Sequence, residues 1–262
     1  MTDKALMTRR FSRSVKTYDG FAAVQDAIAD RMMLLLAPVL SGCGHWPGDC
    51  GPSFPGRVLE IGCGTGLFTR KFLDRYCPEK LWLNDICPDY AEVLSDILGG
   101  GAVFLHGDAE KIPFPEVDLV VSCSALQWFH DLPSFFRKAA GALPEGGILA
   151  FSTFGKDNMR EIAAIEGASL HYWSLDEIKG MLPEGVELLY AGEETVTKYF
   201  DSAMSVLRHL KGTGVTGIRK EFWTRERLMA FGRKYAALFA AADGQLPLTY
   251  HPIWVVCRVR RQ

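Results

Sequence analysis

The sequence lacks any apolar run long enough to form a membrane-spanning helix. Such a helix needs roughly 18 or more apolar residues, and the longest run near the N-terminus, residues 32–40, is shorter and follows acidic residues. The first residues also lack the apolar core and small-residue cleavage site of a signal peptide. These absences predict a cytoplasmic protein with no membrane partner. A length of 262 residues fits one α/β domain with insertions, or one domain with a small cap.

Cysteine is present in an odd number, seven, and five of these residues lie in or beside apolar runs. Buried, reduced thiols fit that placement better than a disulfide framework. Cys43 and Cys50 flank a Gly/Pro-rich segment that contains His45. Their spacing matches no common zinc template, and two further ligands are missing. We therefore predict no metal site.

Positive and negative residues nearly balance overall, but they are unevenly distributed along the chain. The formal net charge is −2, which identifies no partner. From Met204 onward, however, the chain has 11 basic and 3 acidic residues, whereas residues 1–203 have 18 basic and 28 acidic residues. The C-terminal part is therefore a basic segment of +8 attached to an acidic body of −10.

Apolar segments with strand and helix patterns alternate through the middle of the chain. After a helical pattern over residues 20–40 and a Gly/Pro-rich loop over 41–56, nearly all-apolar strands alternate with amphipathic helices. This alternation predicts a doubly wound α/β sheet covered on both faces. The expected strands are 57–62, 80–85, 102–108, 117–125 and 147–153, and the expected helices are 66–76, 88–98 and 132–143.

The C-terminal third breaks this rhythm. A short helix with a Ser174/Glu177 capping box precedes a strand predicted over 186–200. Two helical patterns, 202–212 and 224–242, follow before a last strand predicted over 248–260. Two helices between two late strands predict an insertion over one edge of the sheet.

Three closely spaced glycines follow the first predicted strand in "VLEIGCGTG". Gly62, Gly64 and Gly66 let the backbone turn sharply and let a ligand approach it. Dinucleotide enzymes need the third glycine one place later, as G-x-G-x-x-G. Glu60, two residues upstream, would repel a pyrophosphate but attract an ammonium group. This favours S-adenosylmethionine over NAD, with a ligand-free tight turn as the simpler alternative.

Two more acids end the next two strands, at the edge where ligands bind in open α/β sheets. Asp85 is placed to accept both ribose hydroxyls, a role that NAD sites share, and Asp108 is placed to accept an adenine amino group. A solvated acid, a helix cap or a turn would explain either residue alone. The predicted cofactor-binding residues are Glu60, Gly62, Cys63, Gly64, Gly66, Asp85, Ile86, Asp108, Ala109 and Cys123.

Residues 58–153, with "VLEIGCGTG" and "GDAEKIPF", resemble the class I S-adenosylmethionine-dependent methyltransferases. The resemblance implies a Rossmann-like α/β fold: a mostly parallel seven-stranded sheet with helices on both faces and a helical insertion before the last strand. It implies S-adenosylmethionine as cofactor and S-adenosylhomocysteine as product. It says little about the methyl acceptor.

Five flanking segments carry a second resemblance: "FSRSVKTYD", "SALQWFHDLP", "GGILAFSTFG", "LRHLKGTGVT" and "GQLPLTYHPIWVVCR". Together they resemble a narrower family, the malonyl-acyl-carrier-protein O-methyltransferases of biotin synthesis. The resemblance implies methylation of the free carboxylate of a malonyl thioester held on acyl carrier protein, so that fatty-acid synthesis can extend the disguised group. The loop 41–56 is longer than the family leads us to expect, and Cys123 stands where the family often has Asn.

A malonyl carboxylate is ionised at neutral pH, so this reaction needs no general base, and no His or Cys stands out as catalytic. Tyr18 and Arg13, in a segment that covers the cofactor in related enzymes, are predicted to position the substrate carboxylate. Gln127 and Trp128 follow the fourth strand and face the expected pocket, and Arg160 is a second possible carboxylate partner. For Tyr18, Arg13, Gln127 and Trp128, plain helix packing is the alternative.

The expected organisation has four parts. Residues 1–40 form an N-terminal helical lid, 41–200 the cofactor-binding core, 201–243 an inserted helical cap, and 244–262 the terminal strand of the core. Acyl carrier proteins are acidic, so we predict that the basic cap binds one. A solvated helix face is the alternative. The predicted partner-binding residues are Arg208, Lys211, Arg219 and Lys220.

Two other functions stay open on the sequence alone. One is methylation of a free small carboxylic acid such as trans-aconitate, which would use the same cofactor loop. The other is S-adenosylmethionine binding without methyl transfer, because the motif reports binding rather than turnover. A nucleic-acid methyltransferase is disfavoured: no Asn-Pro-Pro-Tyr-like or Pro-Cys catalytic motif is present. The aromatics also do not interleave with basic residues as single-strand binders require.

Overall fold

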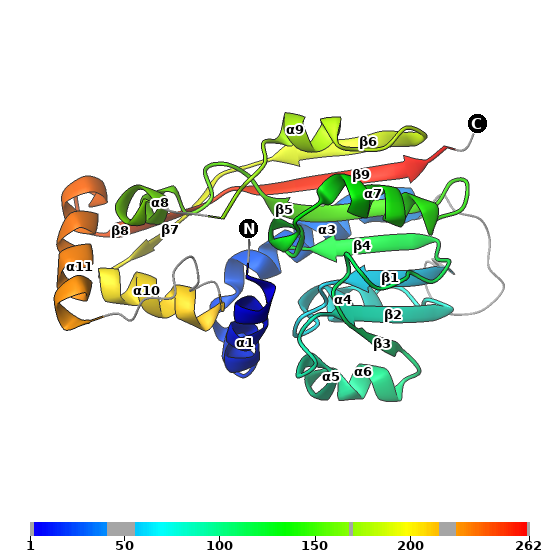
Figure 1. Ribbon diagram of the computed structural model, residues 1–262, viewed down its shortest axis with the longest axis horizontal. Helices are drawn as coiled ribbons and strands as arrows, with labels where there is room; N and C mark the ends of the chain where they lie inside the picture. The colour runs from blue at the N-terminus through cyan, green and yellow to red at the C-terminus, as the bar shows by residue number, and fades with distance from the viewer. Residues whose placement is uncertain (1–2, 41–55, 168–169, 215–223, 261–262) are drawn as a thin grey trace.

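A computed structural model describes residues 3–40, 56–167, 170–214 and 224–260 (Figure 1). Its centre is a seven-stranded sheet in the order β3–β2–β1–β4–β5–β9–β6. The first five strands in this order are parallel, and β9 pairs antiparallel with both β5 and β6. The predicted Rossmann-like fold is therefore confirmed. The strands are β1 (Arg57–Ile61), β2 (Lys80–Asp85), β3 (Val103–His106), β4 (Leu119–Cys123), β5 (Ile148–Phe154), β6 (Val186–Glu193) and β9 (Pro252–Val259).

Helices cover both faces of this sheet. Successive side chains of each strand point to opposite faces, so both faces carry apolar side chains that the helices bury. On one face, Leu119 and Val121 of β4 join the core that α3 (Ala23–Leu40) and α4 (Leu67–Leu73) supply. On the other face, Val120 joins the core that α7 (Leu132–Gly141) and α9 (Leu175–Gly180) supply. This two-sided burial explains why the strands are apolar throughout. The predicted Ser174/Glu177 capping box of α9 is present.

The N-terminal helices lie at the carboxyl ends of the parallel strands. α1 (Lys4–Ser14) and α2 (Tyr18–Phe21) precede α3, and in Figure 1 α1 stands between the main sheet and the helices at the left. The helix predicted over 88–98 is instead two short helices, α5 (Tyr90–Val93) and α6 (Ser95–Gly99), separated by Leu94. An N-terminal segment thus partly covers the carboxyl ends of the parallel strands.

A second, two-stranded sheet extends the molecule at the left of Figure 1. β7 (Val196–Phe200) pairs antiparallel with β8 (Leu246–Tyr250), and α8 (Arg160–Glu166), α10 (Ala203–Gly212) and α11 (Arg225–Phe239) surround it. The single strand predicted over 186–200 is wrong, because the chain leaves the main sheet after Glu193. The single strand predicted over 248–260 is also wrong, because the strand is interrupted at His251. His251 Nε2 lies 3.1 Å from Oε2 of Glu193, the residue at which the chain leaves the main sheet.

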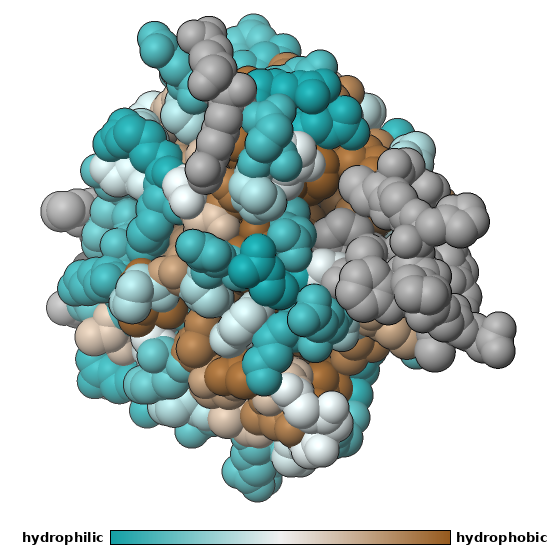
Figure 2. Space-filling view, turned by 90° about the vertical axis from the view of Figure 1, so that its right-hand side faces the viewer, coloured by the Kyte–Doolittle hydropathy of each residue, from teal (hydrophilic) through white to brown (hydrophobic). Residues whose placement is uncertain are grey.

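The opposite end of the main sheet, where the parallel strands begin, carries no predicted functional residue. Figure 2 shows this side of the molecule, where hydrophobic areas lie between hydrophilic residues. Arg57 at the start of β1 holds Asp118 there, with Nη2 and Oδ1 3.2 Å apart. In the described parts of the chain, no helix is long and apolar enough to cross a membrane. Cys43, His45, Cys50, Arg219 and Lys220 lie outside the described residues.

Candidate active site

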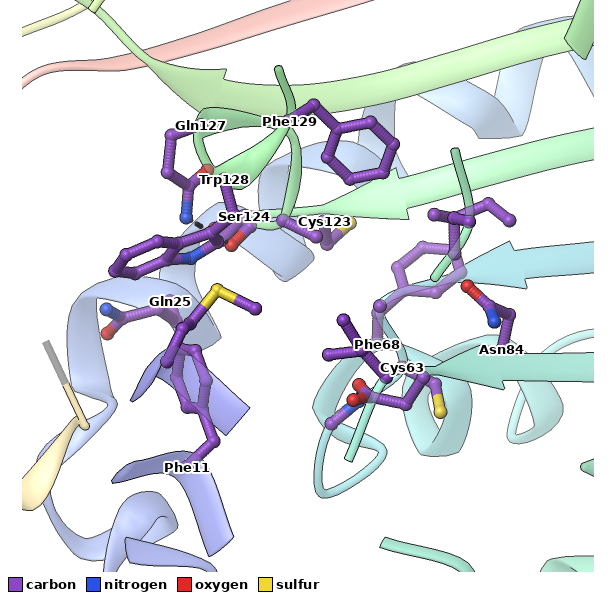
Figure 3. Close-up of a pocket in the computed structure, with 18 of the residues that line it drawn as sticks. Phe11, Gln25, Cys63, Phe68, Asn84, Cys123, Ser124, Gln127, Trp128 and Phe129 are labelled. Carbon is purple, nitrogen blue, oxygen red and sulfur yellow. Dashed lines mark hydrogen bonds between the residues drawn. The ribbon is translucent and has the colours of Figure 1, made fainter. Parts of the chain in front are cut away.

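A cavity opens at the carboxyl ends of the parallel strands, where the strand order reverses between β1 and β4. This is the place where open α/β sheets bind ligands. Figure 3 shows side chains from both sides of the cavity: Phe11, Gln25, Ser124, Gln127 and Trp128 lie on one side, and Cys63, Phe68 and Asn84 on the other. Nine of the ten predicted cofactor residues line this cavity, all except Gly66.

The glycine loop takes backbone conformations that other residues adopt with difficulty. Gly62 has a φ of 68°, and a Cβ placed on it would lie 2.4 Å from the Cβ of Ala125. Gly66 has a φ of 86° at the N-cap of α4, where a Cβ would lie 2.6 Å from Leu94. Glycine is therefore required at both positions. Gly66 shapes the loop, while Gly62 and Gly64 line the cavity.

Asp85 is held at the floor of the cavity by two backbone groups. Gly64 N–H donates to its Oδ2 at 3.0 Å, and Cys87 N–H donates to its Oδ1 at 2.8 Å. Burial raises the pKa of Asp85 to about 6, although these N–H groups favour the charged carboxylate. An aimed carboxylate of this kind can accept hydrogen bonds from a vicinal diol, as predicted for the ribose.

Glu60 is more deeply buried than Asp85, with 2% of its surface exposed. Thr69 Oγ1 donates to its Oε2 at 2.6 Å, and no cation lies beside it among the described hydrogen bonds and ion pairs. Burial raises the pKa of Glu60 to about 8, since a charged carboxylate loses its hydration there. An ammonium group arriving in the cavity would reverse that shift, so the site suits a ligand with a positive charge.

Asp108 is engaged by the N-terminal helix. Lys4 Nζ of α1 lies 2.6 Å from Asp108 Oδ1 and also contacts the Glu110 carboxylate. Burial works against ionisation of Asp108, but the bonds from Lys4 and the Glu110 N–H, together with the charges of Lys4 and Lys111, lower the pKa of this carboxyl group. The described hydrogen bonds to the Asp108 side chain use only Oδ1, which leaves Oδ2 for the predicted adenine amino group.

Three further contacts hold the N-terminal helices over the cavity. Phe11 packs edge-on against Trp128, with ring centroids 5.6 Å apart. Asp19 Oδ1 accepts a 2.6 Å hydrogen bond from Thr65 in the glycine loop, and Ser12 donates to Asp89. The segment from α1 to α2 is therefore tied to the sheet edge at several points.

Within the part of the chain that the structure describes, three buried polar atoms without hydrogen-bond partners line the same cavity. They are Gln25 Oε1, Ser124 Oγ and Gln127 Oε1. Gln127 Nε2 donates to the Ser124 carbonyl oxygen at 2.6 Å, which fixes the orientation of its amide (Figure 3). Buried polar atoms are nearly always paired in folded proteins. Three unpaired polar atoms in one cavity therefore indicate a polar ligand.

The structure separates the predicted substrate-positioning residues into two groups. Tyr18, Gln127 and Trp128 line the cavity. Arg13 and Arg160 do not line it, and both are exposed, with Arg160 Nε 3.6 Å from Glu161 Oε1. Among the described lining residues, Lys4 is the only cation, and it already contacts two carboxylates.

The two cavity cysteines are poor nucleophiles. Burial raises the pKa of both Cys63 and Cys123 well above the usual value for a thiol, so both are uncharged at neutral pH. In the described ranges, no group of three or more His, Cys, Asp or Glu side chains could hold a metal ion.

Sequence reasoning missed several residues that line the part of the cavity beyond β5. Asn158 follows β5, Tyr172 precedes α9, and Thr213 follows α10. Gln25, on α3, lies close to Gln127 and Trp128 in Figure 3. No motif marks these residues, since they come together only when distant segments fold. A buried Gln on an otherwise apolar helix face was the one available signal.

The cavity residues fit the charged parts of S-adenosylmethionine: two buried acids at β1 and β2, a third at β3, and a glycine loop without side chains between them. Residues 59–151 match the family model of a methyltransferase domain. A putative methyltransferase from Bacillus halodurans has the same fold, with a TM-score of 0.58, 19% identity, and coverage of 86% of this chain and 99% of that one. The YcgJ protein of Bacillus subtilis aligns with a TM-score of 0.59 at 16% identity, covering 88% and 98% of the two chains. Fold and site thus define a class I methyltransferase.

Curated relatives place the chain more narrowly. The malonyl-[acyl-carrier protein] O-methyltransferase of Bacteroides helcogenes is 39% identical, over 98% of each chain. The enzyme of the same name from Bacteroides thetaiotaomicron is 39% identical over 99% of each. A Bacteroides fragilis relative is 40% identical over 99% of this chain, which spans about half (51%) of its length. The chain belongs to the malonyl-[acyl-carrier protein] O-methyltransferase family.

Proposed function

We propose that this enzyme transfers a methyl group from S-adenosylmethionine to the free carboxylate of a malonyl thioester on acyl carrier protein. The observation that carries this proposal is the 39% identity over nearly the whole length of relatives with that name. The methyl ester as an early intermediate of biotin synthesis, and a cytoplasmic location, are parts of the same proposal.

The cofactor would be held by three acids on three neighbouring strand ends. Glu60 would pair with its ammonium group, Asp85 with its ribose hydroxyls and Asp108 with its adenine amino group. When bound, S-adenosylmethionine supplies an electrophilic methyl group on a sulfonium. The glycine loop would let the cofactor lie against the backbone, and α1 and α2 would cover it.

The acceptor side of the cavity suits a carboxylate that is already ionised. Methyl transfer from a sulfonium to a carboxylate removes one positive and one negative charge, so the transition state is less charged than the reactants. A water-poor cavity favours such a change. Burial raises the pKa of the Tyr18 hydroxyl, which therefore stays protonated and can donate a hydrogen bond. Positioning by neutral donors would leave the carboxylate nucleophilic.

The remaining parts of the chain would serve access and partner binding. Residues 1–40 would act as a lid and 201–243 as a cap, around the core of 41–200 and 244–262. Arg208 and Lys211 are exposed on α10 and are available to an acidic carrier protein. Arg219 and Lys220, which lie outside the described residues, are the other two residues proposed to bind the carrier.

The test compares initial rates of the purified enzyme on malonyl-acyl carrier protein, malonyl-coenzyme A and trans-aconitate, each with labelled S-adenosylmethionine. We expect the highest kcat/KM on the carrier protein, and a rate that falls with added salt at limiting substrate. A preference for trans-aconitate would replace the proposed substrate, and absence of label on all three would favour a binding protein.

A further inference from the structure

The part of the cavity beyond β5 contains a tyrosine whose hydroxyl orientation can be worked out from its neighbours. Tyr172 is 8% exposed, lines the cavity and lies 2.9 Å from Asn158 Nδ2 through its hydroxyl oxygen. Neither residue belongs to a cofactor motif. The direction of the hydrogen bond between the two side chains decides whether the Tyr172 hydroxyl keeps a proton that it can donate to a bound substrate.

A backbone N–H group settles the direction of this hydrogen bond. His251 N–H lies 3.3 Å from Asn158 Oδ1, and a backbone N–H can only donate. The Asn158 oxygen must therefore face His251, and its Nδ2 must face Tyr172, although amide oxygen and nitrogen are otherwise easily interchanged. Since Nδ2 donates, the Tyr172 oxygen accepts. The phenolic proton is left for another partner.

His251 itself is fixed on two sides. Asp157 N–H donates to His251 Nδ1 at 3.2 Å, so this nitrogen is an acceptor, and Nε2 lies 3.1 Å from Glu193 Oε2, where it can donate. His251 also packs on Gly155, where a Cβ would lie 2.7 Å from its ring. The peptide that orients Asn158 is therefore held at the junction of β8 and β9.

No acceptor for the Tyr172 proton is present among the described hydrogen bonds. Burial raises the pKa of Tyr172 to about 12, so the hydroxyl keeps its proton at neutral pH. Tyr18 lines the same cavity and also has a buried, protonated hydroxyl. Tyr90 lines this cavity too, and burial raises the pKa of its hydroxyl, so three phenolic donors line a cavity whose one described cation, Lys4, is already paired.

We propose that Tyr172, oriented by Asn158, donates a hydrogen bond to the substrate's carboxylate and holds it beside Tyr18 for methylation. The proposal rests on the proposed function. A neutral donor has an advantage over an arginine here, because the product is a neutral ester. An arginine would then remain as an unpaired buried charge, whereas a phenol loses only one hydrogen bond. Tyr172 and Asn158 thus take the place that Arg13 and Arg160 had in the sequence-based prediction.

The experiment measures binding of malonyl- and acetyl-acyl carrier protein to the enzyme saturated with S-adenosylhomocysteine. The two carriers share the thioester, the arm and the protein, and differ only in the carboxylate. Tyr172→Phe should weaken malonyl-carrier binding about tenfold to a hundredfold, the usual effect of losing a hydrogen bond to a charged group, and leave acetyl-carrier binding unchanged. Tyr76→Phe, which removes a hydroxyl from a buried tyrosine outside the cavity lining, is the matched control.

Asn158 is a positioning residue, and its test is a double-mutant cycle. Asn158→Ala should reduce the malonyl-over-acetyl preference of the wild type but add little to Tyr172→Phe, because Asn158 acts through the tyrosine. Equal loss on both carriers, or no loss on the malonyl carrier, would overturn the proposal. If the wild-type enzyme fails to methylate malonyl-acyl carrier protein, the proposed function fails first, and this outcome is seen before any variant is made.

Discussion

Binding of S-adenosylmethionine should release a proton near neutral pH, because Glu60 must ionise to receive the cofactor's ammonium group. Burial raises the pKa of Glu60 to about 8, with Thr69 supplying its only described hydrogen bond. At pH 7, a group with this pKa is protonated in about nine of ten molecules. Each binding event at pH 7 should therefore release close to one proton into the buffer.

The size of the effect follows from linkage between protonation and binding. Affinity should rise about eightfold between pH 6.5 and 7.5, since only the ionised form of Glu60 binds well. Titration calorimetry in two buffers with different ionisation enthalpies measures the proton release directly. Glu60→Gln is the matched variant, because its amide oxygen still accepts from Thr69 but cannot titrate.

For the Glu60→Gln variant we expect opposite effects on ligand binding and on the stability of the fold. The pKa of Glu60 is about 8 in the folded protein and about 4.5 in the unfolded chain. The folded protein therefore loses stability as the pH rises from about 4.5 to about 8, because the buried carboxyl group must ionise. Glu60→Gln without ligand should then melt above the wild type at pH 7.5, while it binds S-adenosylmethionine more weakly and releases no proton. Equal proton release by variant and wild type, or an affinity that is flat over this pH range, would refute the assignment.

Three other predictions follow from the same site. Asp85→Ala should weaken S-adenosylmethionine binding roughly tenfold to a hundredfold, as measured by calorimetry. Asp118→Ala, at the opposite end of the sheet, should leave the affinity unchanged. Unchanged affinity in the Asp85→Ala variant would remove Asp85 from the ribose site. Lys4→Met should increase amide hydrogen exchange over residues 4–14, because it loses both ion pairs that tie α1 to the sheet edge; unaltered exchange would mean that the other contacts suffice. The single-turnover rate at saturating cofactor should be flat between about pH 6 and 8, and a tenfold rise per pH unit would reveal a general base.

The sequence was sufficient to bring the residues of the proposed cofactor site together, because short local patterns determine their positions. Glu60, Gly62 and Gly64 are fixed by a strand–turn–helix unit, and Asp85 and Asp108 end the next two strands. Parallel strands bring such ends to one edge whatever the rest of the chain does. A periodicity argument therefore places all five residues correctly in one cavity.

The acceptor half could not be predicted in the same way. Asn158 and Tyr172 lie in connecting segments that carry no motif, and Asn158 is oriented by His251 at the junction of β8 and β9, a contact that exists only in the folded chain. Arg13 and Arg160 were chosen for their charge, but each lies on an exposed surface. Which face of a helix is buried depends on what packs against it, and charge alone does not report that.

Tandem mass spectrometry of malonyl-acyl carrier protein, after incubation with the enzyme and S-adenosylmethionine, tests the central claim most directly. The account predicts that the carrier gains one methyl group, that fragments of the prosthetic arm carry it, and that it resides on the malonyl carboxylate as an ester. A carrier that stays unmodified while the enzyme binds the cofactor, or a methyl group found elsewhere on the carrier, would contradict it.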